Sequence, residues 1–361
     1  MKTIFICTDG TWSTILTSDR RGFSPTNVTK MARILKTTKD QLVYYDRGVG
    51  TGGFFDRILG GAGGHGLFKN VKQAYRFLVE NYREGDRICI FGFSRGAYTA
   101  RSLAGLVTAV GILRKKYLAD IDSAFRLYRK PRKFGNILND YRQNFCYPDN
   151  AVLFVGVWDT VGTLGIPVSG LRLLTAWRYK FHNTRLSPYV LNAYHAIALD
   201  EKRIPFRPTL WLAENLSKNQ KVEQRWFPGT HSNIGGGYQD AGLSDTAFMW
   251  MLEKLKDTLH RAGQPLAVDN KYIRRHIHPD ACAELRDSCT GLFWIYTLNP
   301  FIRKPLHPEY ANQIIDASVY DRMRCKNRYY RPRNIPDKDL QAGQSKHRAR
   351  KTGTPGEGHR R

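Results

Sequence analysis

The chain has 361 residues, of which 42% are hydrophobic and 12% aromatic, and this composition excludes a wholly disordered protein. No run approaches the about 20 apolar residues that a membrane-spanning helix needs, and the sequence begins with a strand-like run without a leader. A cytoplasmic protein is therefore expected, with leaderless export left open. The formal net charge of +26 predicts binding to polyanions: anionic lipid head groups, nucleic acid or an acidic partner protein.

Apolar runs typical of strands alternate with helix-like runs along the chain. Strands are expected at residues 3–7, 41–45, 87–91, 151–157 and 221–227, and helices at about 26–37, 68–82, 97–113, 189–198 and 245–261. This alternation predicts an α/β fold whose mostly parallel sheet carries helices on both faces. The functional side chains of such a fold gather at the carboxyl ends of the strands.

The periodicity divides the chain into three parts. Residues 1–263 are expected to form the α/β core, interrupted by basic, aromatic and poorly periodic insertions at 114–150 and 163–188. We interpret these insertions as a cap over a pocket, with surface additions as the alternative. Residues 264–333 are expected to be a C-terminal extension packed on the core. Residues 334–361 have almost no apolar anchor and are predicted to be a basic, disordered tail.

The glycine-rich segment 48–66 contains Gly48-x-Gly50-x-x-Gly53 after a predicted strand. A dinucleotide-binding fingerprint would lead straight into a helix and would have an acidic residue about 20 positions later. Here more glycine follows and position 73 is Gln, so no nucleotide cofactor is expected. We interpret the segment as a movable flap at a pocket mouth, with a flexible connection as the alternative.

The sequence Gly92-Phe93-Ser94-Arg95-Gly96 lies between a predicted strand and a predicted helix. This context is typical of a nucleophile elbow, in which a strained serine stands on a sharp turn and small residues leave room on either side. The N-terminus of the following helix directs backbone N–H groups at a developing negative charge. We therefore predict Ser94 as a nucleophile and the N–H of Arg95 as an oxyanion donor.

A serine nucleophile needs a base and an acid, which follow it in this fold in the order Ser, Asp or Glu, His. Asp159 directly follows the predicted strand 151–157, and His231 follows the break after the strand 221–227. We predict Asp159 as the acid and His231 as the base. Asp245 is the alternative acid, although it comes after the histidine in the chain.

Asp9, Gly10, Thr11 and Trp12 follow the first predicted strand. A glycine-containing loop at this end of the sheet usually supplies the second oxyanion donor, so we predict the N–H of Gly10 or Thr11 for that role. Asp9, Trp12 and Asp245 are predicted to line the substrate pocket. The alternative is a turn in which Asp9 only caps the backbone.

The six cysteines form no CxxC pair, and Cys7 and Cys89 lie inside predicted strands. Free, buried thiols are expected, with a disulfide between Cys282 and Cys289 as the alternative. The histidines of the run from His276 to His278 have no recognisable ligand spacing, so no metal site is expected.

Six motifs in one order, spread over residues 3 to 252, resemble a bacterial family of largely uncharacterised α/β hydrolase domains. The family includes phospholipase effectors of type VI secretion systems. The resemblance implies an α/β-hydrolase fold with Ser94, Asp159 and His231 as the triad. The motifs are Asp9-Gly10-Thr11-Trp12, Gly92 to Ala97, Trp158 to Gly162, Ala198 to Glu201, Trp226 to His231 with Gly235 to Tyr238, and Leu243 to Asp245.

The site and the resemblance together predict a serine hydrolase that cleaves an acyl ester of a phospholipid or another lipid. The alternative is a basic binding module for nucleic acid or an acidic partner, with an idle triad on a hydrolase scaffold. Residues 322–361 contain 13 Lys or Arg against three acidic residues, a net charge of +10. This tail is the predicted contact with an anionic membrane surface or nucleic acid.

Overall fold

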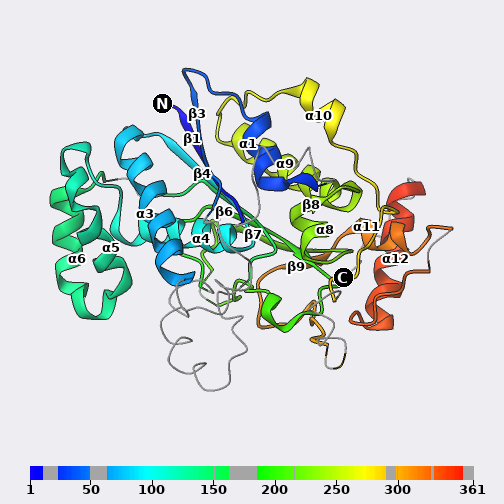
Figure 1. Ribbon diagram of the computed structural model, residues 1–361. Coiled ribbons are helices and arrows are strands. Elements are labelled where there is room, and N and C mark those ends of the chain that lie inside the picture. Colours follow the sequence, from blue (N-terminus) through cyan, green and yellow to red (C-terminus); the bar gives the residue numbers. More distant parts are fainter. Residues whose placement is uncertain are drawn as a thin grey trace, which may run out of the picture.

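A sheet of parallel strands forms the centre of the protein (Figure 1). The computed structural model describes residues 1–10, 23–48, 63–148, 151–161, 185–214, 216–289, 298, 300–326 and 329–352. Within these ranges every neighbouring pair of strands in the main sheet is parallel. In sheet order the strands are β3 (Gln41–Asp46), β1 (Thr3–Thr8), β4 (Arg87–Phe93), β5 (Phe154–Trp158), β6 (Asn192–Ala198), β7 (Lys221–Phe227) and β9 (Gln313–Ile315).

Helices cover both faces of this sheet (Figure 1). Successive residues of a strand point to opposite faces, so a parallel sheet covered on both sides needs a continuous apolar run such as that of β1. The helices are α3 (Gly63–Asn81), α4 (Arg95–Val110) and α5 (Ile121–Arg129) on the face of Ile4, and α1 (Asn27–Ile34) and α9 (Gly242–Arg261) on the face of Phe5. The α/β-hydrolase architecture predicted from the sequence is confirmed. None of the helices in the described ranges is both long and apolar enough to cross a bilayer.

Two strands of the main sheet differ from the sequence prediction. Residues 189–198 were expected to be helical, but Asn192–Ala198 form β6, whose seven residues are all buried between β5 and β7. A short apolar run is typical of both a buried helix and a buried strand, so the sequence pattern does not distinguish them. Here hydrogen bonding to a neighbouring strand on each side stabilises the strand. The three-residue edge strand β9 was not predicted, because it is too short to show a period.

The insertion 114–150 is helical and comprises η1 (Lys115–Asp120), α5 and α6 (Pro131–Phe145). It begins where α4 ends. Since α4 starts directly after Ser94 and runs for 16 residues, about 24 Å, its end is remote from the carboxyl edge of the sheet. In Figure 1, α5 and α6 accordingly lie beyond α3 at one side of the molecule. This position favours a surface addition over a cap. The second predicted insertion lies outside the described residues up to position 184.

The predicted disorder of residues 334–361 is wrong for Asp337–Thr352, which form α12. Leu340 anchors this helix: it is 3% exposed and belongs to a core cluster with Val319 and Tyr320 of α11 (Ala317–Arg322). The polar composition of the segment as a whole did not indicate this contact. Figure 1 shows α11 and α12 side by side at the end of the sheet that carries β9. Residues 353–361 lie outside the described ranges.

One disulfide corrects the cysteine prediction. Cys282 pairs with Cys325 across 43 residues, with a Cα–Cα distance of 5.9 Å, and Cys289 is a free thiol. Cys7 and Cys89 are free and buried, as predicted. Sequence spacing favoured the nearer cysteine, whereas the path of the C-terminal extension brings the distant one into reach.

A buried ion pair joins the two helices on one face of the sheet. Nζ of Lys30 in α1 lies 2.6 Å from Oδ1 of Asp245 in α9, and both side chains are 2% exposed. Oδ2 of Asp245 also accepts a hydrogen bond from the N–H of His278 at 2.8 Å. Removing one partner of such a pair leaves an uncompensated charge in the interior.

We therefore expect Asp245→Ala to lower the free energy of unfolding by about 3–5 kcal/mol, because it leaves the Lys30 charge buried without a counter-ion. Urea unfolding followed by circular dichroism measures this change. Asp257→Ala, which removes an exposed carboxylate from the same helix, is the matched control and should have little effect. Equal stability of the two variants would contradict the importance of the pair.

Candidate active site

The turn between β4 and α4 holds Ser94 in a backbone conformation that residues with a side chain seldom adopt. Its φ is 57° and its ψ is −120°. A Cβ atom on Gly92 would lie 2.6 Å from Cα of Ala97, and one on Gly96 would lie 2.6 Å from the carbonyl oxygen of Asp9. Both glycines are therefore required by close approach of backbone, which is the geometry of a nucleophile elbow.

Three of the predicted side chains form one hydrogen-bonded chain at the carboxyl edge of the sheet. Ser94 follows β4, Asp159 follows β5, and His231 opens the short helix α8 (His231–Gly235) after β7. Nε2 of His231 lies 2.9 Å from Oγ of Ser94, and Nδ1 lies 2.6 Å from Oδ2 of Asp159. The imidazole ring also contacts the rings of Phe93 and Phe206, at centroid distances of 4.6 and 4.8 Å.

The Asp159 carboxylate is fully buried and receives four hydrogen bonds. Oδ1 accepts from the N–H of Ala198 at 3.0 Å and from Nη1 of Arg303 at 2.6 Å. Oδ2 accepts from Nη2 of Arg303 at 3.0 Å and from His231. Burial alone would raise the pKa of Asp159, but the Arg303 charge and then the His231 hydrogen bond hold it below its usual value. The carboxylate therefore stays ionised at neutral pH.

Arg303 is a residue of the site that the sequence did not reveal. Its side chain is completely buried, and it also donates to the carbonyl oxygens of Ala198 at 2.7 Å and Phe206 at 2.6 Å. It comes from the C-terminal extension, 144 positions after Asp159. A single arginine in a segment without a clear period gives no signal from which this contact could be predicted.

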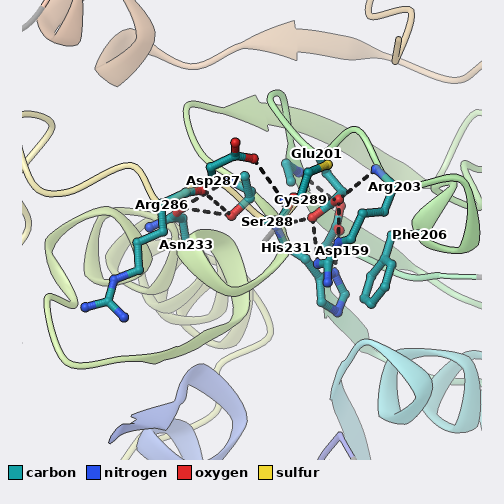
Figure 2. Close-up of polar contacts among 12 residues, drawn as sticks. Asp159, Glu201, Arg203, Phe206, His231, Asn233, Arg286, Asp287, Ser288 and Cys289 are labelled. Atoms are coloured by element: carbon teal, nitrogen blue, oxygen red, sulfur yellow. Dashed lines mark hydrogen bonds and ion pairs between the residues drawn. The ribbon is translucent and has the colours of Figure 1, made fainter. Parts of the chain in front are cut away.

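Glu201 is a second such residue and fixes the backbone that carries His231 (Figure 2). Its carboxylate accepts from the N–H of His231 at 3.2 Å and from Oγ of Ser288 at 2.9 Å. It also accepts from Nε and Nη2 of Arg203, at 2.8 and 2.9 Å. Burial would raise the pKa of Glu201, but Arg203 lowers it to about 2. Glu201 lay within a motif of the sequence resemblance, without an assigned role.

The protonation state of His231 follows from opposing effects. Burial lowers the pKa of His231 below its ordinary value of 6.5, while the hydrogen bond and charge of Asp159 act in the opposite direction. Burial outweighs the carboxylate, so the imidazole is neutral at pH 7. A neutral imidazole whose Nδ1–H is donated to Asp159 leaves Nε2 free to accept a proton from Ser94.

The predicted oxyanion donors have different surroundings. The Arg95 amide is the first of α4, and Gly10 lies beside Ser94, since a Cβ on Gly10 would be 3.5 Å from the serine Cβ. However, the Gly10 N–H donates to Oδ1 of Asp9 at 2.7 Å and is therefore engaged. Thr11, the other predicted donor, lies outside the described residues.

Asp9 is a buried anchor for this loop. Its Oδ2 accepts from the hydroxyls of Thr26 at 2.6 Å, Thr29 at 2.8 Å and Tyr45 at 2.9 Å. Burial raises the pKa of Asp9, although these hydrogen bonds lower it in part. The carboxylate therefore holds the turn after β1 in place, which agrees with the capping alternative raised by the sequence.

Asp245, a predicted pocket residue and the alternative acid, does not join the site. Asp245 pairs with Lys30 and His278 in the interior, and it makes no hydrogen bond to His231. Trp12 and residues 49–62 of the predicted flap lie outside the described ranges. Among the described residues, no group of three His, Cys, Asp or Glu side chains could hold a metal ion.

Comparison with known proteins assigns most of the chain to one family of catalytic domains. Residues 2–254 match the family described as type VI secretion system (T6SS), phospholipase effector Tle1-like, catalytic domain. The uncharacterized protein YEL023C of Saccharomyces cerevisiae is 29% identical over 235 residues, which are 57% of this chain and 32% of the yeast protein. The chain therefore spans about a third of the length of this relative.

Three solved structures are also similar, each with a TM-score below 0.5. An uncharacterized protein from Pseudomonas aeruginosa has a TM-score of 0.48 and 16% identity, over 77% of this chain and 49% of that one. The Tle1 effector bound to the VgrG spike from the type VI secretion system has a TM-score of 0.36 and 20% identity, over 66% and 51%. The butyrate-bound esterase Est2 of Thermogutta terrifontis has a TM-score of 0.38 and 15% identity, over 73% and 84%.

Replacement of Arg303 tests the electrostatics of the site without an activity assay. We expect Arg303→Met to raise the pKa of His231, because the Asp159 charge is then no longer shared with a cation and stabilises the imidazolium more strongly. An NMR titration of the His231 ring measures this pKa. Arg303→Lys, which keeps the charge, should shift it less.

Arg331→Met is the control, since this arginine forms an exposed ion pair with Asp337. An unchanged or lower pKa of His231 in folded Arg303→Met protein would contradict the assignment.

Proposed function

The chain belongs to the family of Tle1-like phospholipase effector catalytic domains, and from this we propose that it is a serine hydrolase that cleaves acyl esters of lipids, with phospholipids as the first candidate. The observation that carries the proposal is the continuous hydrogen-bonded chain from Ser94 through His231 to Asp159. Its order along the sequence and its distances suit nucleophilic acyl transfer.

In the proposed reaction, Ser94 Oγ attacks the ester carbonyl carbon while Nε2 of His231 takes the hydroxyl proton across 2.9 Å. The tetrahedral intermediate collapses when the imidazolium returns this proton to the departing alcohol, leaving an acyl-serine. Water then attacks the acyl carbon while His231 takes its proton. The second tetrahedral intermediate collapses as the imidazolium returns this proton to Ser94 Oγ, which releases the carboxylic acid. Asp159 keeps its charge throughout, because Arg303 holds its pKa low, and it stabilises the imidazolium without taking the proton.

The oxyanion of each tetrahedral intermediate needs donors that are already oriented. We propose the N–H of Arg95 as the first donor, since it begins the helix that follows Ser94. Thr11 is the better second candidate, because the Gly10 N–H is engaged by Asp9. Asp9 then acts as a positioning residue, which orients the loop that precedes the donor.

We expect Ser94→Ala and His231→Ala each to lower kcat for short p-nitrophenyl esters by about 10⁶-fold, because a nucleophile and its base act as a unit. Spectrophotometric assays measure the loss, and labelling by a fluorophosphonate probe should vanish in Ser94→Ala protein. Ser102→Ala, a buried serine on the same helix, is the matched control and should retain labelling. An unlabelled native protein would favour the alternative of a binding module with an idle triad.

We also propose that the basic C-terminal region contacts anionic lipid surfaces. Residues 346, 348, 350 and 351 in the sequence of α12 are Lys or Arg, and segments rich in basic residues attract anionic head groups. Their replacement by Gln should weaken cosedimentation with phosphatidylserine vesicles and leave short-ester hydrolysis unchanged.

The control replaces four exposed lysines elsewhere by Gln, namely Lys39, Lys116, Lys130 and Lys256. Equal loss in both variants would show a general charge effect. Binding to nucleic acid but not to vesicles would contradict the lipid proposal.

A further inference from the structure

Two short segments lie side by side at the carboxyl edge of the sheet. Residues 202–207 come shortly after β6, and residues 300–304 belong to the C-terminal extension. The N–H of Phe301 donates to the carbonyl oxygen of Lys202 at 2.9 Å. Cζ of Arg207 lies 4.4 Å from the centre of the Phe301 ring. Backbone and side-chain contacts therefore join the two segments into one surface.

This surface borders the candidate active site. Arg303 of the second segment binds Asp159 and also donates to the carbonyl oxygen of Phe206 in the first segment, at 2.6 Å. The Phe206 ring in turn packs against the ring of His231, with 4.8 Å between the ring centres (Figure 2). Both segments are thus fixed by the same residues that hold the Ser94–His231–Asp159 chain.

Each segment has a buried arginine between an exposed lysine and an exposed isoleucine. Arg203 and Arg303 are buried because their guanidinium groups bind the carboxylates of Glu201 and Asp159. The residues on either side of each arginine are exposed instead. With Arg207 they form a surface that we call the rim, which consists of Lys202, Ile204, Arg207, Ile302 and Lys304.

Exposed apolar side chains gather at the rim and beside it. The described part of the chain exposes nine large apolar side chains, and four of these lie in residues 202–207 and 298–306. They are Ile204, Leu298, Ile302 and Leu306. Single exposed apolar residues are ordinary, whereas a group in two adjoining segments marks a contact surface.

The charge of the rim indicates the partner. Lys202, Arg207 and Lys304 are exposed, and neither residues 202–208 nor residues 298–308 contain Asp or Glu. A surface that combines apolar side chains with cations fits the interface of an anionic bilayer, because the head groups attract the cations and the acyl region accepts the apolar groups. The charge and the apolar character of the rim therefore favour the same occupant.

We propose that the rim docks the protein on an anionic phospholipid bilayer, with Ile204 and Ile302 inserted below the head groups and Lys202 and Lys304 beside the lipid phosphates. Docking in this way turns the edge that carries Ser94 toward the lipid layer. The choice of a lipid layer rests on the proposed function, whereas the contact itself does not need a working nucleophile. The rim differs from the basic helix α12 because it adds apolar insertion to charge.

Partitioning of full-length Ser94→Ala protein onto vesicles tests the docking without turnover. On vesicles of phosphatidylcholine and phosphatidylserine, the added change Ile302→Ser should lower the partition coefficient about threefold, because one apolar side chain no longer leaves water. Ile204→Ser together with Ile302→Ser should lower it about tenfold. Ile137→Ser is the matched control and should have no effect, since this isoleucine of α6 is 53% exposed, against 59% for Ile302, and lies away from the site.

Charge and insertion are separated by lipid composition and salt. Lys202→Gln together with Lys304→Gln should weaken partitioning onto the phosphatidylserine vesicles by about 30-fold and have little effect on pure phosphatidylcholine vesicles. Binding by Ser94→Ala protein should decrease but persist in about 1 M NaCl, where the Debye length is about 3 Å, because salt does not screen apolar insertion. Complete loss of binding in this salt would contradict the insertion of the isoleucines.

The same substitutions in protein that keeps Ser94 test the link to activity. Ile204→Ser with Ile302→Ser should slow hydrolysis of vesicle phospholipid and leave short p-nitrophenyl ester hydrolysis unchanged, and circular dichroism checks folding. Absence of any ester hydrolysis would refute the proposed function, whereas the vesicle measurements would still decide the docking. Equal partitioning with and without the two isoleucines, equal loss in Ile137→Ser, or binding to an acidic protein but not to vesicles would overturn the docking proposal.

Discussion

The Asp159 carboxylate is the point on which the geometry of the candidate site depends. It is a charge with no access to solvent, and it is tolerable there only because four donors meet its two oxygens. One donor comes from the end of β6, one from α8 and two from the C-terminal extension. The same contacts therefore tie together three segments that are distant in sequence, and they set the position of the His231 ring.

Backbone strain at the carboxyl edge fits this account. Ser94 and Asp159 both have positive φ values, 57° and 35°, and both follow directly on neighbouring parallel strands. Such conformations persist only where the surrounding structure holds them. The backbone at Ser94 is held by the close packing of the turn between β4 and α4, where Gly92 and Gly96 allow neighbouring backbone to approach. The backbone at Asp159 is held by Arg303 and the Ala198 amide. Close packing therefore holds the backbone at Ser94, and electrostatic contacts hold it at Asp159, both at the carboxyl edge of the sheet.

The parts of the site that the sequence predicted are those with local signals. Ser94 was identifiable from flanking glycines between a strand and a helix, and Asp159 and His231 from their places after later strands. Arg303 and Cys325 act through contacts with no local pattern, so only the folded chain reveals them. The strand β6 was mistaken for a helix because burial between two neighbours, rather than periodicity, determines its conformation.

The family match ends at residue 254, whereas Arg303 lies beyond it. A domain boundary placed at the end of this match would thus separate Asp159 from its main counter-ion, Arg303. Replacement of Arg303 would therefore alter the charge balance around His231 although no residue of the matched region has changed.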